Sequence, residues 1–174
     1  MIPAARRGPS DPALILRPAT AADIEATAAV ATRSYRAGFA GILDAAALDV
    51  RTPDFFAERF RAALKLLVVA ERDGAIQGFS LMTNRHIDML FVEPDSHRMG
   101  IGRALLAEAE SRGATSLECF RANFAARTFY ESQGWHLAQA YTRPFAGRDH
   151  EFVRYEKPAR PANPAGPGHE RRRR

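Results

Sequence analysis

One stretch decides the fold of this chain: Leu90-Phe91-Val92-Glu93-Pro94-Asp95-Ser96-His97-Arg98-Met99-Gly100-Ile101-Gly102-Arg103-Ala104-Leu105-Leu106. It reads as an apolar strand that runs through a short glycine turn directly into a helix. The first turn of a helix leaves backbone N–H groups without internal partners and carries a partial positive charge, so peptide dipoles there can bind a diphosphate. Gly100 and Gly102 let the backbone approach such a group, and Arg98 and Arg103 add guanidinium groups at its rim. The stretch therefore predicts a phosphate cradle.

Two common nucleotide-binding patterns fit this cradle poorly. A Rossmann fingerprint needs a third glycine where Leu105 stands, and an acidic residue after a following strand, which the chain lacks at the expected distance. A P-loop needs Gly-Lys-Ser/Thr, but the only lysines are Lys65 and Lys157, and neither follows such a glycine turn. Another diphosphate ligand is therefore favoured.

Two motifs carry a family resemblance. The segment His97-Arg98-Met99-Gly100-Ile101-Gly102 resembles the coenzyme A signature Arg/Gln-x-x-Gly-x-Gly/Ala of the Gcn5-related N-acetyltransferase (GNAT) family, with His97 in place of Arg or Gln. The segment from Asn123 to Trp135 resembles that family's Asn-x-x-Ala-x-x-Phe-Tyr-x-x-x-Gly-Phe, with Trp135 in place of Phe. The motifs occur in the family's order, separated by one strand-like run, and the resemblance covers residues 13–157.

Periodicity and turn signals predict the order of the elements. Strands are expected at 13–17, 65–72, 75–83, 86–92, 114–120, 135–141 and 151–156, and helices at 20–35, from 52 through Phe60, at 100–112 and at 123–133. Asp73-Gly74 marks a hairpin turn. Hairpins come first and a strand-helix-strand unit follows, so we predict an α/β (α+β) fold with a mixed, mostly antiparallel central sheet and helices on both faces. The resemblance implies the GNAT-like acyl-CoA N-acyltransferase fold.

Composition limits the class of protein. A chain of 174 residues is expected to form one domain, and nothing in it resembles a secretion signal or a membrane-spanning helix, so a cytoplasmic location is expected. Cys119 is the only cysteine, and its place in an apolar run favours an inert buried thiol. We expect a flexible segment at 1–12, an acetyltransferase domain at 13–157 and a disordered tail at 158–174.

The charge is concentrated in the tail. The net charge is +5, but residues 158–174 hold five arginines and one glutamate, so the rest of the chain is nearly neutral. A solvated tail is therefore favoured over a specific nucleic-acid-binding function, which would give steeply salt-dependent binding through that tail. Whether the arginines have a role stays open.

The resemblance implies that acetyl-CoA is the co-substrate and that no metal is needed. It assigns cofactor binding to the strand end, the glycine turn and the second motif, namely Phe91, Val92, His97, Arg98, Met99, Gly100, Ile101, Gly102, Arg103, Asn123 and Phe129. The family's splayed strand would place the thioester beside Phe91 and Val92, with the Val92 N–H as the candidate oxyanion donor. Asn123 is expected to contact the pantetheine arm, to cap its helix, or both.

Tyr130 is the candidate general acid. Its position in the second motif implies that it protonates the departing thiolate, and a phenol has a suitable reference pKa of about 10. The alternative is an aromatic core residue beside Phe129.

The candidate general bases are His86 and Asp88. Strand alternation would place His86, Asp88, Leu90 and Val92 on one face. His86 falls where several relatives keep a catalytic carboxylate, and Asp88 could raise its basicity or bind a cationic acceptor. The alternatives are a solvated strand end for His86 and a structural hydrogen bond for Asp88, while many relatives use water relays instead of a base. Glu93 precedes Pro94 and is expected to serve the turn.

The segment between the first two helices is expected to line the acceptor pocket. It contains four aromatic and four acidic residues: Tyr35, Phe39, Phe55, Phe56, Asp44, Asp49, Asp54 and Glu58. Aromatic rings with carboxylates suit a cationic, partly apolar amine. For any single member, a core or solvated-surface role is the simpler interpretation.

The leading function hypothesis is an N-acetyltransferase that moves an acetyl group from acetyl-CoA to the primary amine of a small molecule. The alternatives are a protein lysine or N-terminal acetyltransferase and a non-catalytic acyl-CoA-binding module; Tyr130 argues against the last. The acceptor is not identified by the sequence. Relatives are often dimers, so a homodimer stays open.

Overall fold

A single sheet organises the part of the chain described by the computed structural model, residues 13–158. Its seven strands lie in the order β1 (Ile15–Pro18), β2 (Leu67–Arg72), β3 (Ala75–Thr83), β4 (His86–Val92), β5 (Ser116–Phe120), β7 (Arg148–Glu156) and β6 (His136–Phe145). Every neighbouring pair is antiparallel except β4 and β5, which are parallel. The predicted mixed, mostly antiparallel sheet is confirmed. The expectations for residues 1–12 and 159–174 lie outside the described residues.

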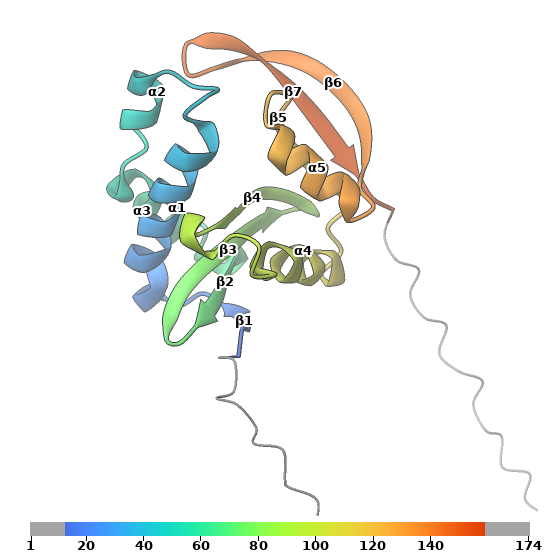
Figure 1. The fold of residues 1–174 in the computed structure, drawn as a ribbon. Coiled ribbons are helices and arrows are strands. Elements are labelled where there is room, and N and C mark those ends of the chain that lie inside the picture. Colours follow the sequence, from blue (N-terminus) through green and yellow to red (C-terminus); the bar gives the residue numbers. More distant parts are fainter. Residues whose placement is uncertain (1–12, 159–174) are drawn as a thin grey trace, which may run out of the picture.

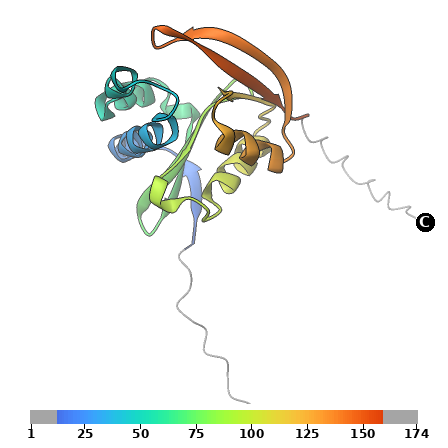
Figure 2. The ribbon, with the colours of Figure 1, turned by 45° about the horizontal axis from the view of Figure 1, so that its top comes forward.

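Helices cover both faces of this sheet, as predicted. One group comprises α1 (Ile24–Phe39), α2 (Ala45–Asp49) and α3 (Pro53–Ala62), and the other α4 (Ile101–Ser111) and α5 (Phe124–Ser132) (Figures 1 and 2). Short 3₁₀ turns lie at η1 (Ala21–Asp23), η2 (Leu64–Leu66) and η3 (Pro94–Ser96). Side chains of α1 and α3 pack with Phe79 of β3, while Leu105 and Leu106 of α4 are buried against the opposite face.

Local sequence signals set several of the helix ends. Thr52 accepts a hydrogen bond from the Phe55 N–H at 3.2 Å, Pro53 occupies the first position of α3, and Asn123 caps α5 by accepting from the Ala126 N–H at 3.1 Å. The structure also contains α2, which the sequence did not indicate. It is five residues long and is capped by Asp44, which accepts from the Ala47 N–H at 2.9 Å.

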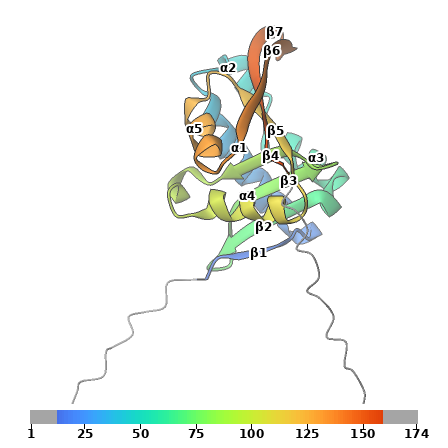
Figure 3. The ribbon, with the colours of Figure 1, turned by 90° about the vertical axis from the view of Figure 1, so that its right-hand side faces the viewer.

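The β6–β7 hairpin is longer than predicted. Its strands meet at Ala146 and Gly147, which have φ angles of 50° and 81° and make the tight turn. The sequence prediction missed this turn because alanine is not a typical residue at positive φ. The hairpin extends beyond the rest of the sheet toward α2 (Figures 1 and 3), where Arg148 lies 3.4 Å from Asp44.

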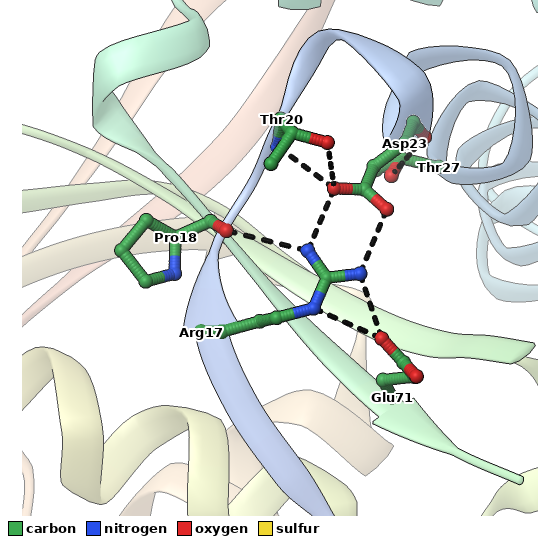
Figure 4. A network of polar contacts seen from close by, with 6 residues as sticks. All are labelled: Arg17, Pro18, Thr20, Asp23, Thr27 and Glu71. Atoms are coloured by element: carbon green, nitrogen blue, oxygen red, sulfur yellow. Dashed lines mark hydrogen bonds and ion pairs between the residues drawn. The ribbon is translucent and has the colours of Figure 1, made fainter. Parts of the chain in front are cut away.

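An ion-pair network joins strands β1 and β2 to the start of α1 (Figure 4). Arg17 in β1 donates to both carboxylate oxygens of Asp23 at 2.7 and 2.8 Å, and to Glu71 in β2 at 2.7 and 2.9 Å. Asp23 also accepts from the N–H and hydroxyl of Thr20. The Arg17 hydrogen bonds lower the pKa of Asp23 well below its usual range, although burial opposes the shift. The network therefore fixes the start of α1 against the sheet.

Candidate active site

The parallel strands β4 and β5 separate after the first two residues of each strand. Their ladder pairs His86 with Ser116 and Ile87 with Leu117, and it ends there. From Asp88 to Val92, one edge of β4 is paired with β3 while the other faces an opening toward β5. The sheet therefore has a splayed site at its centre.

The backbone N–H and C=O of Val92 face this opening. The N–H of the next residue, Glu93, donates to the Gln77 carbonyl in β3 at 2.8 Å. Because successive residues of a strand direct their backbone groups to opposite edges, the N–H and C=O of Val92 point away from β3. The Val92 carbonyl accordingly accepts from Ser34 at 2.9 Å and lies 3.2 Å from His97 Nε2. The Val92 N–H is thus available at the open edge.

A β-bulge lies at Asp88. Leu81 of β3 pairs with Met89 and Met82 pairs with Ile87, so Asp88 is an extra residue in β4. The expectation that His86, Asp88, Leu90 and Val92 share one face is therefore wrong: Ile87 packs in the same apolar cluster as Leu90. The bulge interrupts the side-chain alternation because it inserts one residue without a partner.

The glycine turn lies beside the open edge of β4. Gly100 has φ +79° and Arg98 φ +65°, so the turn is left-handed at both positions. Gly102 lies next to α5, because a Cβ added there would stand 3.6 Å from the Phe129 ring and 3.7 Å from Val92 Cγ2. Met99 and Arg103 are exposed on this turn, and Ile101 is buried.

The start of α4 differs from the starts of α2, α3 and α5. No side chain caps it, and the first N–H to bond back is that of Ala104, which donates to the Gly100 carbonyl at 3.0 Å. The N–H groups of Ile101, Gly102 and Arg103 precede that bond, so the helix itself gives them no partner. The residues fit an anionic group such as a diphosphate, with the helix dipole and the exposed Arg98 and Arg103 alongside.

A cavity of about 310 Å³ lies between the splayed strands and the helices. Its aromatic lining comes from α1, α3, β4, β5 and the hairpin: Tyr35, Phe39, Phe55, Phe56, Phe91, Phe120, Phe145 and Phe152. Its polar lining includes His86, Asp88, Glu118, Cys119, Asn123 and Tyr130. The structure therefore brings the three residues expected to be catalytic, Tyr130, His86 and Asp88, to one cavity.

Tyr130 is 8% exposed and packs in the cluster beneath α5. Burial raises its pKa, with a smaller contribution from Cys119, so the phenol stays protonated over the physiological range. Cys119 is half-buried, and burial raises the pKa of its thiol to about 12. The high thiol pKa agrees with the expectation of an unreactive cysteine.

His86 lies at the closed end of the opening. Its Nδ1 is 2.9 Å from the Ser116 hydroxyl, across the last part of the β4–β5 ladder. Glu118 on β5 carries a hydrogen bond from Tyr141 and one from Arg143 at 2.6 Å. Burial by itself would raise the pKa of Glu118, but these two hydrogen bonds and the nearby charge of Arg143 together lower the pKa.

The predicted acceptor segment contributes its aromatic residues to the cavity but not its acids. Asp44 and Asp49 instead face Arg148 and Arg36, at 3.4 and 3.1 Å, and neither these acids nor Asp54 and Glu58 line the cavity. Arg51, Arg59 and Arg143 are there in their place. The simpler interpretation, exposed surface acids, therefore holds for these four residues, and this side of the cavity carries arginines instead of their carboxylates.

Sequence reasoning missed these three arginines and Glu118. A charged residue within the apolar run of β5 was a usable signal for Glu118. Arg143 had no such signal, because its strand extends beyond the predicted end. Glu93 behaves as expected: it precedes η3 and binds Arg33 through two hydrogen bonds of 2.8 and 2.7 Å.

A splayed parallel pair, a β-bulge and an uncapped helix after a glycine turn are the arrangement that the resemblance implies for an acyl-CoA N-acyltransferase fold. Residues 30–158 match the family described as the acetyltransferase (GNAT) domain. The chain therefore belongs to the GNAT acetyltransferase family. The family and fold predicted from the two motifs are confirmed, and the enzyme class expected for the chain is that of the family.

Relatives support the same assignment. Peptidyl-lysine N-acetyltransferase YiaC of Escherichia coli K12 is 39% identical over 71 residues, which cover 40% of this chain and 49% of YiaC. The chain thus spans about half the length of the curated relatives it matches.

Solved structures show the likeness in fold. The solution structure of apo YjaB from Escherichia coli has a TM-score of 0.67 and 23% identity, with 83% of this chain and 97% of that chain covered. The PaiA N-acetyltransferase of Thermoplasma acidophilum, solved in complex with coenzyme A, has a TM-score of 0.63 and 18% identity, with 83% and 99% covered. Among residues 13–158, no helix has the length and apolar character needed to cross a bilayer.

Proposed function

We propose that this protein transfers an acetyl group from acetyl-CoA to the primary amine of a small molecule. The observation that carries the proposal is the uncapped start of α4 beside the open edge of β4. One element offers free N–H groups to a diphosphate, and the other offers backbone groups to an extended arm. Together they fit the two ends of coenzyme A.

Each part of the cofactor has residues that would hold it. The N–H groups from Met99 to Arg103 would bind the diphosphate, with Arg98 and Arg103 as cationic partners and His97 at the entrance. The backbone of Phe91 and Val92 would align the pantetheine arm along β4. Phe129 and Asn123 would face that arm from α5 and its N-terminal cap. The Asn123 side-chain oxygen makes the capping bond, so its NH2 group would contact the arm.

Acetyl-CoA supplies the acetyl group as a thioester. The Val92 N–H, directed into the opening, would donate a hydrogen bond to the thioester oxygen and stabilise negative charge there as the amine attacks. The Tyr130 hydroxyl would donate its proton to the thiolate sulfur as the carbon–sulfur bond breaks. Its raised pKa suits this role because the proton donor must be protonated at working pH.

The amine must lose a proton before or during the attack. His86 and Asp88 are the proposed bases, because both line the cavity and both are next to the opening. His86 is oriented by Ser116 at 2.9 Å, and Asp88 is exposed at the bulge. A water chain from the cavity to His86 would serve the same purpose.

The shape of the cavity favours a small acceptor. Its volume of about 310 Å³ is at the lower end of the range for small-molecule sites, and Phe145 and Phe152 of the hairpin form part of its wall. The second candidate acceptor is a lysine side chain of a protein, which the names of YiaC and YjaB support.

The test has a binding part and a turnover part. Acetyl-CoA is expected to raise the melting temperature, because a ligand that binds the folded state stabilises it, and calorimetry is expected to detect the binding. Release of free coenzyme A is then measured with small amines and with lysine-containing peptides. A folded protein that gives no heat with acetyl-CoA or coenzyme A overturns the proposal, and faster turnover of peptides than of small amines replaces the acceptor with the second candidate.

A further inference from the structure

Arginine side chains line the acceptor side of the cavity. Arg143 is neutralised by Glu118, at 2.6 Å. Within residues 13–158, Arg51 and Arg59 have no ion-pair partner, although both line the cavity. A cationic wall in a site for amines needs an explanation, because it repels a simple ammonium group.

Arg51 is held among aromatic rings. Its guanidinium carbon lies 4.5 Å from the centroid of the Phe55 ring, 5.8 Å from that of Phe145 and 5.9 Å from that of Tyr35. These rings come from three different elements, so the half-buried guanidinium is oriented at the mouth of the site while its N–H groups stay free for a ligand. Arg59 lies one helical turn beyond Phe55 on α3 and adds a second, more exposed cation.

Tyr35 provides an independent observation. Its side chain lines the same cavity and is 7% exposed, and its hydroxyl is buried without a hydrogen-bond partner among the described residues. Buried hydroxyl groups are nearly always paired, so an unpaired one in a cavity indicates a place for a polar ligand atom. A hydroxyl near a guanidinium is a suitable donor pair for a carboxylate.

The carboxylates of the cavity bear on where the amine end of such a ligand would lie. Glu118 is already occupied by Tyr141 and Arg143, whereas Asp88 has no ion-pair partner within the described residues. Asp88 lies at the bulge of β4, on the strand that carries the proposed oxyanion donor. An ammonium group is therefore favoured near β4 and an anionic group near α3.

We infer that the acceptor is a small amino carboxylic acid, whose carboxylate is bound by Arg51, the Tyr35 hydroxyl and Arg59 while its amine is directed toward β4. This inference rests on the proposed acetyltransferase function and adds the substrate class. Arg51 is then the residue that determines specificity. A carboxylate in an acidic peptide has the same chemistry, but the small cavity beneath the hairpin favours the free amino acid.

The test compares pairs of acceptors that differ only in the carboxylate, such as lysine with cadaverine and phenylalanine with phenethylamine. Both members of each pair are assayed by coenzyme A release at saturating acetyl-CoA. The carboxylated member is expected to have the larger kcat/KM by about tenfold to a hundredfold, because a charge-assisted site left unpaired rejects the analogue.

Variants then assign the preference to Arg51. Arg51→Met is expected to lower the ratio within each pair at least tenfold, and Arg51→Lys to restore part of it by keeping a charge without the planar fork. Arg61→Met is the matched control, since Arg61 is on α3, the helix that follows Arg51, pairs with Glu25 at the surface and is outside the cavity. A melting-temperature rise with acetyl-CoA shows that each variant is folded.

The outcomes separate this inference from the function on which it rests. Equal turnover of both members of each pair, or an unchanged ratio in Arg51→Met, overturns the inference and leaves the acetyltransferase in place. Faster turnover of acidic peptides than of free amino acids also overturns it, because the carboxylate bound by Arg51 would then belong to a peptide. If the folded wild-type protein does not bind acetyl-CoA, the proposed function and this inference are both overturned.

Discussion

The Ser34 hydroxyl donates a hydrogen bond of 2.9 Å to the carbonyl of Val92, fifty-eight residues further along the chain. This bond connects α1 to the edge of β4 where the sheet opens. It holds the peptide between Val92 and Glu93, which directly follows the peptide whose N–H is proposed to stabilise the thioester oxygen. A buried serine on a helix thus positions a backbone group on a strand.

Replacing Ser34 tests this relationship. Ser34→Ala is expected to lower the free energy of unfolding by about 1 kcal/mol and kcat/KM by about tenfold, because the Val92 carbonyl loses one hydrogen bond and the end of β4 next to the Val92 N–H is held less firmly. Urea unfolding and coenzyme A release measure the two effects. Ser111→Ala is the control, since Ser111 bonds only within its own helix. Activity equal to that of the wild type would show that the Ser34 bond does not contribute to the position of the Val92 N–H.

Tyr130→Phe separates catalysis from binding. Removing the hydroxyl is expected to slow turnover by about a hundredfold, as loss of a general acid does, and to leave the acetyl-CoA melting shift largely intact. The wild-type rate is also expected to show no loss from Tyr130 ionisation below about pH 10, because burial raises the pKa of this phenol above its usual value. Turnover of the variant at the wild-type rate would remove Tyr130 from the mechanism.

The Arg17–Asp23 pair predicts a pH dependence of stability. The pKa of Asp23 is lower in the folded protein than in the unfolded chain, where it is about 3.9. Its contribution is therefore complete above about pH 4 and is lost as the pH falls further. Asp23→Asn is expected to cost about 2 kcal/mol at pH 7, and the gap to the wild type should narrow in urea titrations below about pH 4.

A surface pair is the control for that experiment. Glu25 and Arg61 form an exposed ion pair, and Glu25→Gln is expected to change stability by less than about 1 kcal/mol at any pH. If Asp23→Asn and wild type differ by the same amount at pH 3 and pH 7, the network is not the source of the acid sensitivity.

The two glycines of the turn are expected to respond in opposite directions. Gly100→Ala forces a side chain to φ +79° and is expected to cost about 1 kcal/mol of stability. Gly102→Ala replaces a helical glycine where the added Cβ meets only ordinary contacts of 3.6 and 3.7 Å, so stability is expected to rise by up to about 1 kcal/mol. Urea unfolding of the two proteins checks both signs, and a Gly100→Ala variant as stable as the wild type would contradict the first.

Much of the site followed from local patterns, because its parts are encoded close together. The sequence predicted a glycine turn that leads directly into a helix, and the structure shows that turn with positive φ at Gly100. Tyr130 and Asn123 were located by the resemblance to the family's second motif, and the Asn123 cap is present. The catalytic and binding roles of these residues stay proposals.

Other features depended on contacts between distant residues. The bulge at Asp88 arises from the pairing of β4 with β3, and no spacing within β4 shows an extra residue. The acidic residues of the acceptor segment looked available in sequence, but Asp44 and Asp49 bind Arg148 and Arg36, while Arg51 is held by rings from α1, α3 and β6. The charge of the acceptor wall was therefore a property of packing.

The sequence by itself determined the order of the seven strands and four of the helices, the glycine turn and, through two motifs, the family, because these depend on backbone preferences, hydrophobic periods and residue patterns within short segments. Tertiary structure alone decided the place where β4 and β5 separate, the direction of the Val92 N–H and the arginines that line the acceptor cavity. The physical reason is that hydrogen-bond register and ion pairing join residues far apart in the chain, and only the folded sheet brings those partners within reach of one another.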